Sequence, residues 1–110
     1  MPYKVVVTEK AKRHLADIFD YIAYELYSPG AAKKLFDKIA QAIESLDTFP
    51  KRFAVLDLGE EFSDEIRRIT VKNYSVFYTV QEEEKTVVVI GVFYSASDFK
   101  TKLLDDRNKD

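Results

Sequence analysis

Four consecutive apolar residues, Val87-Val88-Val89-Ile90, constrain the fold of this 110-residue chain more than any other feature. A strand with one face in water alternates apolar and polar residues, whereas this run is apolar at every position. The strand predicted over Thr86 to Tyr94 should therefore lie in the middle of a sheet and be covered on both faces. This longest apolar run is strand-sized and too short to cross a membrane, so no membrane association is expected.

Two amphipathic helices are predicted between residues 9 and 46. In both segments apolar residues recur at steps of three and four, so each helix presents one apolar stripe to a core. The first helix is predicted to end near Tyr27, Ser28-Pro29 begins the second, and Phe49-Pro50 stops it. Because the link between them is short, the two helices should form an antiparallel hairpin.

The remaining segments are rich in β-forming residues. Strands are predicted at Tyr3 to Val7, Phe53 to Leu58, Glu65 to Val71, Tyr74 to Val80 and Thr86 to Tyr94. The simplest arrangement of the later strands is an antiparallel meander. The order β-α-α-β-β-β-β predicts an α+β fold, in which a helical hairpin backs a twisted sheet.

The length of the chain predicts a single domain over residues 1–110. Residues 99–110 are expected to form a flexible tail, with one or two helical turns through Leu103-Leu104.

Composition and charge exclude several classes of function. The 17 Lys and Arg against 19 Asp and Glu leave a net charge of -2, so a nucleic-acid role would need a local basic patch. The absence of cysteine excludes disulfides and thiolate zinc sites and suits a reducing cytoplasm. Without a cluster of metal-ligand spacing or a glycine-rich phosphate loop, no metal or cofactor is expected. The single histidine, His14, is expected at a surface or edge rather than in a catalytic site.

Several short segments stand in an order that is more informative than any one of them. They are the opening strand, Asp17-Ile18-Phe19-Asp20-Tyr21-Ile22, Ser28-Pro29-Gly30-Ala31-Ala32, Phe49-Pro50-Lys51-Arg52, Ile66-Arg67-Arg68-Ile69, Tyr74-Ser75-Val76-Phe77-Tyr78-Thr79-Val80 and Val89-Ile90-Gly91-Val92-Phe93-Tyr94. Together they resemble the RelE/ParE toxin superfamily of type II toxin-antitoxin systems, which includes plasmid stabilisation proteins, from Val5 to about Phe99. The resemblance implies a bacterial toxin that a cognate antitoxin wraps and neutralises.

The resemblance also implies one of two activities, because RelE-like members cut messenger RNA on the ribosome and ParE-like members poison DNA gyrase. RNA cleavage needs a base, an acid and cations near the phosphate. In RelE-like sequences the segment after the last central strand brings basic residues, but here it reads Tyr94-Ser95-Ala96-Ser97-Asp98. Many ParE-like sequences have His and Arg where this chain, as we align it, has Tyr94 and Ser97, so it departs from that pattern too.

We therefore expect a toxin nearer to ParE, acting by binding a target such as DNA gyrase. One alternative is a ribosome-dependent, metal-independent endoribonuclease that acts on messenger RNA. Another is a degenerate, non-toxic member that only binds partners. The sequence leaves open whether the chain is an enzyme, which target it binds and whether it forms a homodimer.

The candidate site residues lie mostly on the predicted strands. For RNA chemistry they are Arg68, Tyr78 and Tyr94, and for contact with the target they are Lys51, Arg52, Arg68, Tyr74 and Asp98. Strand alternation puts Arg68 on the face of Ile66 and Thr70, and puts Arg67 with Ile69 and Val71, whose side should pack on the helices. Plain packing or solvated surface positions would also explain these residues.

Tyr21, Tyr24 and Tyr27 are spaced by three along the first helix and predict a tyrosine ridge. Tyrosine combines a large contact area with a polar tip, as protein interfaces favour. These residues are the candidates for antitoxin binding, although they could equally cap the edge of the core.

Overall fold

The computed structural model describes residues 2–60, 62 and 64–108. Strand β1 (Lys4–Val7) leads into helix α1 (Glu9–Asp20), which continues as a π-helical turn, η1 (Tyr21–Glu25). Helix α2 (Pro29–Glu44) runs back and ends in two short 3-10 turns, η2 (Ser45–Asp47) and η3 (Pro50–Arg52). Strands β2 (Arg67–Val71), β3 (Tyr74–Gln81) and β4 (Thr86–Tyr94) follow, and helix α3 (Phe99–Asn108) comes last.

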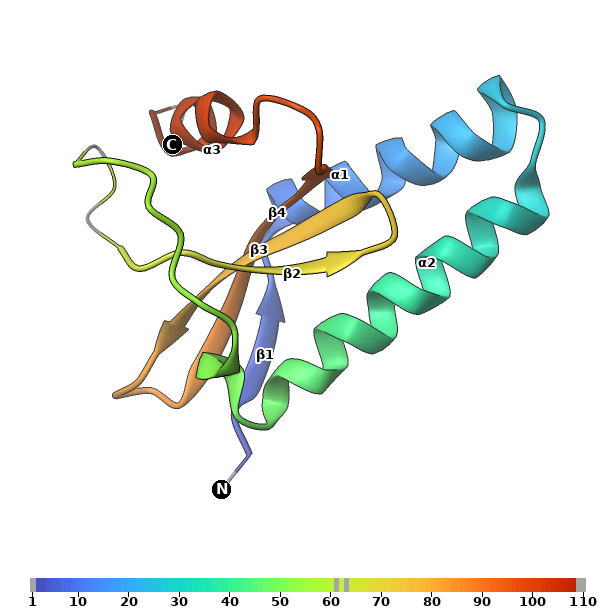
Figure 1. Ribbon diagram of the computed structural model, residues 1–110. Helices are drawn as coiled ribbons and strands as arrows, with labels where there is room; N and C mark the ends of the chain where they lie inside the picture. Colours follow the sequence, from blue (N-terminus) through green and yellow to red (C-terminus); the bar gives the residue numbers. More distant parts are fainter. Residues whose placement is uncertain (1, 61, 63, 109–110) are drawn as a thin grey trace.

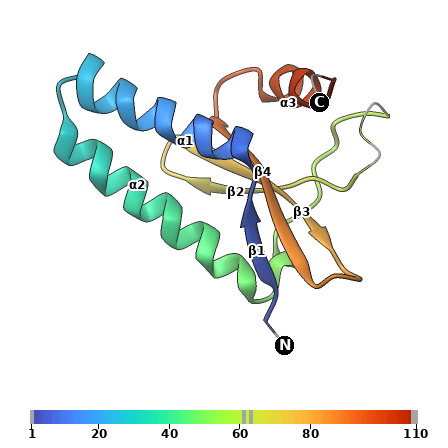
Figure 2. The ribbon, with the colours of Figure 1, turned by 180° about the vertical axis from the view of Figure 1, so that it is seen from behind.

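Within the described chain, four strands form one sheet in the order β1-β4-β3-β2. Figures 1 and 2 show the hairpin of α1 and α2 on one side of this sheet and α3 at the opposite side. The predicted α+β class is therefore confirmed, including the helical hairpin and the central, doubly covered position of β4.

The sheet has a hydrophobic core on each face. On the hairpin side, Val76, Tyr78, Val87 and Val89 pack with residues of both helices, such as Ala11 and Ile39. On the other face, the second core consists of Leu58, Ile66, Phe77, Phe93 and Leu103. Alternate residues of β3 contribute to different cores, as the side-chain period of two requires. In β4 a bulge opposite Phe77 and Tyr78 breaks the alternation, so Val87 and Val89 lie in one core and Phe93 in the other.

Strand β1 pairs with β4 in parallel, a relationship that the predicted antiparallel meander did not include. The hairpin returns the chain to the beginning of β1, where the Tyr3 backbone N–H donates to the Asp47 carbonyl at 2.8 Å. From that end the chain makes the antiparallel strands β2, β3 and β4, so β4 runs in the same direction as β1. The meander is correct for three strands, and the parallel pair follows from the position at which the hairpin ends.

The strand predicted at Phe53 to Leu58 is wrong, because the structure has only an isolated bridge there, between Val55 and Arg67. Phe53 packs against the hairpin-side core and Leu58 belongs to the core on the other face. The segment therefore passes around the edge of the sheet instead of running along it.

His14 lies at the open edge of β4 beyond the end of β1. Its Nδ1 accepts a hydrogen bond from the Val92 N–H at 3.3 Å, and its ring centroid is 4.4 Å from that of Phe93. The half-buried imidazole thus satisfies a strand N–H that β1 is too short to reach. This is the edge position expected for His14.

Helix α3 extends beyond the one or two turns predicted for the tail. The Asp98 carboxylate accepts hydrogen bonds from the Thr101 backbone N–H at 3.3 Å and its hydroxyl at 2.8 Å, which caps the start of the helix. Leu103 is buried in the second core. Residues 109 and 110 of the predicted tail lie outside the described residues.

Candidate functional site

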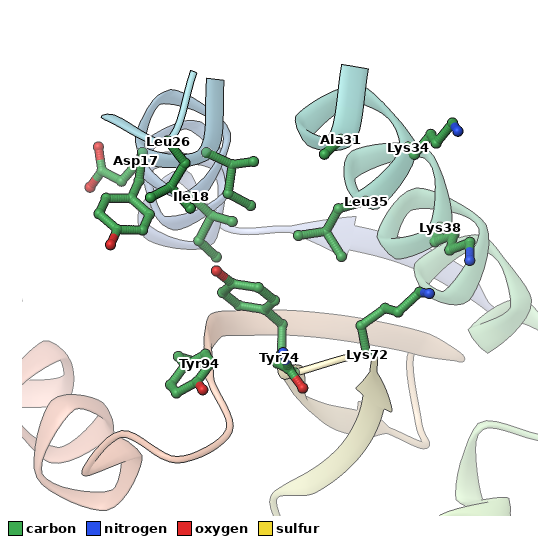
Figure 3. Close-up of a pocket in the computed structure, with 13 residues that line it drawn as sticks. Asp17, Ile18, Leu26, Ala31, Lys34, Leu35, Lys38, Lys72, Tyr74 and Tyr94 are labelled. Carbon is green, nitrogen blue, oxygen red and sulfur yellow. The ribbon is translucent and has the colours of Figure 1, made fainter. Parts of the chain in front are cut away.

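A groove of about 850 Å³ separates the far end of the helical hairpin from the β2–β3 turn. The loop between the helices projects beyond the sheet, so apolar side chains near it have no strand beneath them (Figure 1). The apolar lining comes from both helices and consists of Ile18, Ile22, Leu26, Ala31 and Leu35. Figure 3 shows Ile18, Leu26 and Leu35 facing Tyr74 across this groove.

Tyrosines form the sheet side of the groove and part of its rim. Tyr74 and Tyr94 are cross-strand partners whose ring centroids lie 5.6 Å apart in an edge-to-face arrangement. Burial raises the pKa of Tyr74 above its ordinary value of 10.0, with smaller contributions from Tyr94 and Tyr21. The Tyr74 phenol therefore stays protonated at neutral pH and can donate a hydrogen bond to a bound group.

Three lysines gather at one rim of the groove. Lys34 and Lys38 are one turn apart on α2, and Lys72 begins the two-residue turn between β2 and β3. Hydrogen bonding with Lys72 and then its charge lower the pKa of Lys38 below its ordinary value of 10.5, and burial and Lys34 contribute further. Figure 3 shows the Lys38 and Lys72 side chains converging, whereas Asp17 lies at the opposite rim.

The predicted tyrosine ridge is divided in the structure. Tyr21 lines the groove and is 53% exposed, whereas Tyr24 and Tyr27, 68% and 88% exposed, lie outside its lining. The reason is the π-helical turn, in which the Leu26 N–H bonds to the Tyr21 carbonyl at 3.1 Å, five residues back. A spacing of three does not align side chains on such a turn, and Tyr27 has already left the helix with a positive φ of 52°.

The catalytic candidates Arg68, Tyr78 and Tyr94 are not brought together. Tyr78 is fully buried and its hydroxyl donates to the Pro50 carbonyl at 2.6 Å, so it is not presented to a ligand. Arg68 lies on the face of the sheet next to α3, with its guanidinium 5.4 Å from the centroid of the Phe99 ring. Only Tyr94, which is 48% exposed, reaches the groove.

The two arginines of β2 lie on opposite faces, as predicted. Ile69 and Val71 pack against the hairpin-side core, and Ile66 belongs to the other core. Arg67, on the hairpin side, donates hydrogen bonds to the carbonyls of Lys51 and Phe53. Its guanidinium therefore holds the loop after α2.

Other target-binding candidates are engaged in local structure. Lys51 forms an ion pair with Glu82 at 3.1 Å. Arg52 donates to the Thr48 carbonyl at 2.6 Å and to the Ser45 carbonyl at 3.3 Å, which satisfies backbone groups after the end of α2. The Asp98 carboxylate caps α3. Of the target-binding candidates, Tyr74 is the one that lines the groove.

Sequence reasoning missed the lysines of the groove. The spacing of four between Lys34 and Lys38 would have placed them on one helix face, but nothing local relates that face to a turn 34 residues further along the chain. In the described part of the chain, no three His, Asp or Glu side chains are grouped in a way that could hold a metal ion. Nor is any helix there long and apolar enough to cross a membrane.

Comparison with known proteins identifies one family. Residues 5–99 match the family model described as the ParE toxin of type II toxin-antitoxin systems. Among curated proteins, none matches this chain.

Solved structures of similar fold come from several organisms. The chromosomal ParDE toxin-antitoxin system of P. aeruginosa is similar at 20% identity and a TM-score of 0.67, over 84% of this chain and 95% of that one. A RelBE toxin-antitoxin complex from Mycobacterium tuberculosis is similar at 21% identity and a TM-score of 0.62, over 86% and 99% of the chains. A mutant of the E. coli toxin RelE in the free state is similar at 15% identity and a TM-score of 0.62, over 97% of this chain and 98% of that one. At these identities the likeness is one of fold.

Proposed function

The chain belongs to the ParE toxin family of type II toxin-antitoxin systems, and we propose that it is neutralised by a cognate antitoxin and acts by binding a target such as DNA gyrase. The observation that carries this proposal is the open apolar groove rimmed by exposed tyrosines. Such a surface suits a polypeptide partner, because tyrosine is among the side chains that supply most of the energy at the centre of protein interfaces, and the apolar contacts around it exclude water.

The positions of the charged groups support binding rather than catalysis. Arg52 and Arg67 are both held by backbone carbonyls, and Lys51 is paired with Glu82. The Tyr78 hydroxyl is buried in a hydrogen bond. A nuclease needs an acid and a base within reach of one phosphate, and these side chains are directed elsewhere.

The similar solved structures support an antitoxin partner. The M. tuberculosis structure is a toxin-antitoxin complex, and the P. aeruginosa structure is of a ParDE system. We infer that the partner of this chain covers exposed apolar side chains of the groove, of which Tyr21, Leu26 and Tyr94 are each about half exposed.

One observation favours a second candidate function, a ribosome-dependent endoribonuclease. Lys34, Lys38 and Lys72 line the same groove as Tyr74 and Tyr94, which gives a local basic patch in a chain of net charge -2. Lysines can stabilise charge on a phosphate, and tyrosines can stack on bases. Arg68, the other cationic candidate for RNA chemistry, lies on the opposite face of the sheet against Phe99.

Expression of the chain in bacterial cells, alone and together with the polypeptide encoded by the adjacent reading frame, tests the proposal. We expect growth arrest with filamentation and DNA damage when the chain is alone, and relief when the neighbour is present. Purified chain should also inhibit supercoiling by DNA gyrase. Cleavage of messenger RNA in ribosomes programmed with it would support the second candidate instead, and absence of any effect would indicate a non-toxic member.

A further inference from the structure

Several cationic side chains elsewhere in the molecule have a carboxylate partner within the chain. Lys51 and Lys85 both contact the Glu82 carboxylate, at 3.1 and 2.7 Å, and Lys12 pairs with Glu9 at 3.3 Å. Lys34, Lys38 and Lys72 line one groove, and none of the carboxylates in the described ranges lies within 4.0 Å of them. Their charge is therefore available to a ligand.

The lysines also oppose one another. The pKa of Lys38 is lowered, first by hydrogen bonding with Lys72, which means that a second ammonium group is brought near against its own repulsion. An anion placed between the two would relieve this repulsion and would favour the charged form of Lys38.

Lys72 occupies a position at which its backbone is strained. Its φ is 56°, in the region that favours glycine, at the first position of a two-residue hairpin loop. Glycine would fit this backbone better, so the turn itself does not require a lysine here. This position allows the ammonium group to be removed without damage to the turn.

We propose that Lys34, Lys38 and Lys72 form a carboxylate-binding site at the rim of the groove, occupied by an Asp or Glu side chain of an otherwise apolar antitoxin segment. This inference rests on the proposed function and names the chemistry of the partner. The apolar side chains of the segment lie against Ile22 and Leu35, while its carboxylate meets the ammonium groups.

The composition of the groove favours such a segment over RNA. A nucleic-acid strand carries a phosphate at every nucleotide and is bound by cations along its path. Here the cations occupy one rim only, Asp17 stands at the other, and the surface between them consists of aliphatic side chains and tyrosines. An amphipathic polypeptide with few charges matches this pattern, because it buries apolar area and places one acid at the basic rim.

Isothermal titration of the polypeptide encoded by the adjacent reading frame tests the site. The triple variant Lys34→Gln, Lys38→Gln and Lys72→Gly removes the three ammonium groups. Its matched control is Lys4→Gln, Lys33→Gln and Lys100→Gln, which changes the net charge equally at exposed positions outside the groove. We expect the Kd to rise about 10- to 100-fold in the groove variant and less than about 2-fold in the control.

Three further measurements complete the test. Thermal unfolding of Lys72→Gly alone should show a fold at least as stable as the wild type, while its affinity for the partner falls. Added salt should weaken wild-type binding more steeply than binding by the groove variant. A labelled single-stranded RNA should bind neither protein tightly.

The outcomes separate this site from the proposed function. If the wild-type chain does not bind the neighbouring polypeptide, the proposed function and this site both fail. If wild type and groove variant bind it with equal affinity, the site alone is overturned. Tight RNA binding that the groove variant loses, with partner affinity unchanged, would show a polyanion site instead.

Discussion

The Tyr78 hydroxyl donates a 2.6 Å hydrogen bond to the Pro50 carbonyl, and both residues are buried. The bond joins the middle of β3 to the turn that follows α2, two segments 28 residues apart in the sequence. Burial raises the pKa of Tyr78 above its ordinary value of 10.0, against the opposing charges of Arg67 and Arg52. The phenol therefore remains a donor throughout the neutral range.

Tyr78→Phe should lower the free energy of unfolding by about 1–2 kcal/mol, because the buried Pro50 carbonyl loses its donor. Urea unfolding measures the change. Tyr24→Phe is the matched control, since that hydroxyl is on a largely exposed side chain, and it should stay within about 0.5 kcal/mol of the wild type. Equal stability of the two variants would contradict the structural role assigned to Tyr78.

Glu82, in the turn between β3 and β4, joins this turn to residue 3 and to the turn that follows α2. Its carboxylate accepts hydrogen bonds from Lys85 at 2.7 Å and Tyr3 at 2.8 Å, and it pairs with Lys51 at 3.1 Å. These contacts, Lys85 first, lower the pKa of Glu82 from 4.5 to about 2. The ionised carboxylate is therefore favoured in the folded state, and its stabilisation is present at neutral pH.

Glu82→Gln should be less stable than the wild type at neutral pH, and the difference should shrink as pH falls below 4.5 toward about 2. The reason is that protonation of Glu82 removes from the wild type the same charge that the variant lacks. Melting temperatures of both proteins across this range measure the effect. A difference that stays constant down to the acid end would show that the charge of Glu82 contributes nothing.

Lys38→Gln should stabilise the free protein at neutral pH. Since the folded pKa of Lys38 lies below the ordinary 10.5, its charged form is disfavoured beside Lys72 and Lys34, and the variant removes that repulsion. The advantage should shrink as pH rises above the folded pKa of Lys38, where the folded wild type loses the charge, and should be gone above 10.5. Chemical denaturation at neutral and alkaline pH tests this, with Lys33→Gln as the unaffected neighbour.

His14→Ala should destabilise the protein by about 1–3 kcal/mol, because the Val92 N–H loses its acceptor and Phe93 loses a ring contact. His14→Asn places an amide oxygen near the position of Nδ1, so this variant should lose less stability than His14→Ala. Hydrogen exchange of the Val92 amide, followed by NMR, reports the bond directly. Unchanged exchange in His14→Ala would show that the imidazole is not the acceptor.

The periodicity of the sequence was sufficient to predict most of the fold. Steps of three and four indicated both helices, and the unbroken apolar run placed β4 in the centre of the sheet. The parallel pairing of β1 with β4 was beyond local patterns, because it depends on where the hairpin returns the chain. The same is true of the segment after Phe53, which passes from one core to the other.

The candidate site was predicted only in part. Tyr21, Tyr74 and Tyr94 line one groove. Tyr78 lies on the same strand as Tyr74, but its side chain is buried. Strand alternation assigned faces correctly for Arg67 and Arg68, yet it could not show that their guanidinium groups have local partners. Local signals also gave no reason to join Lys72 to the lysines of α2, since the fold alone brings them together.

Hydroxyl-radical footprinting of the chain with and without the polypeptide from the adjacent reading frame tests most directly whether the groove is the partner surface. Tyr21 and Tyr94, at 53% and 48% exposure, should lose reactivity on binding. Phe49, which is 79% exposed and lies outside the groove lining, should keep it. Protection of Phe49 with Tyr21 and Tyr94 still reactive would contradict the account.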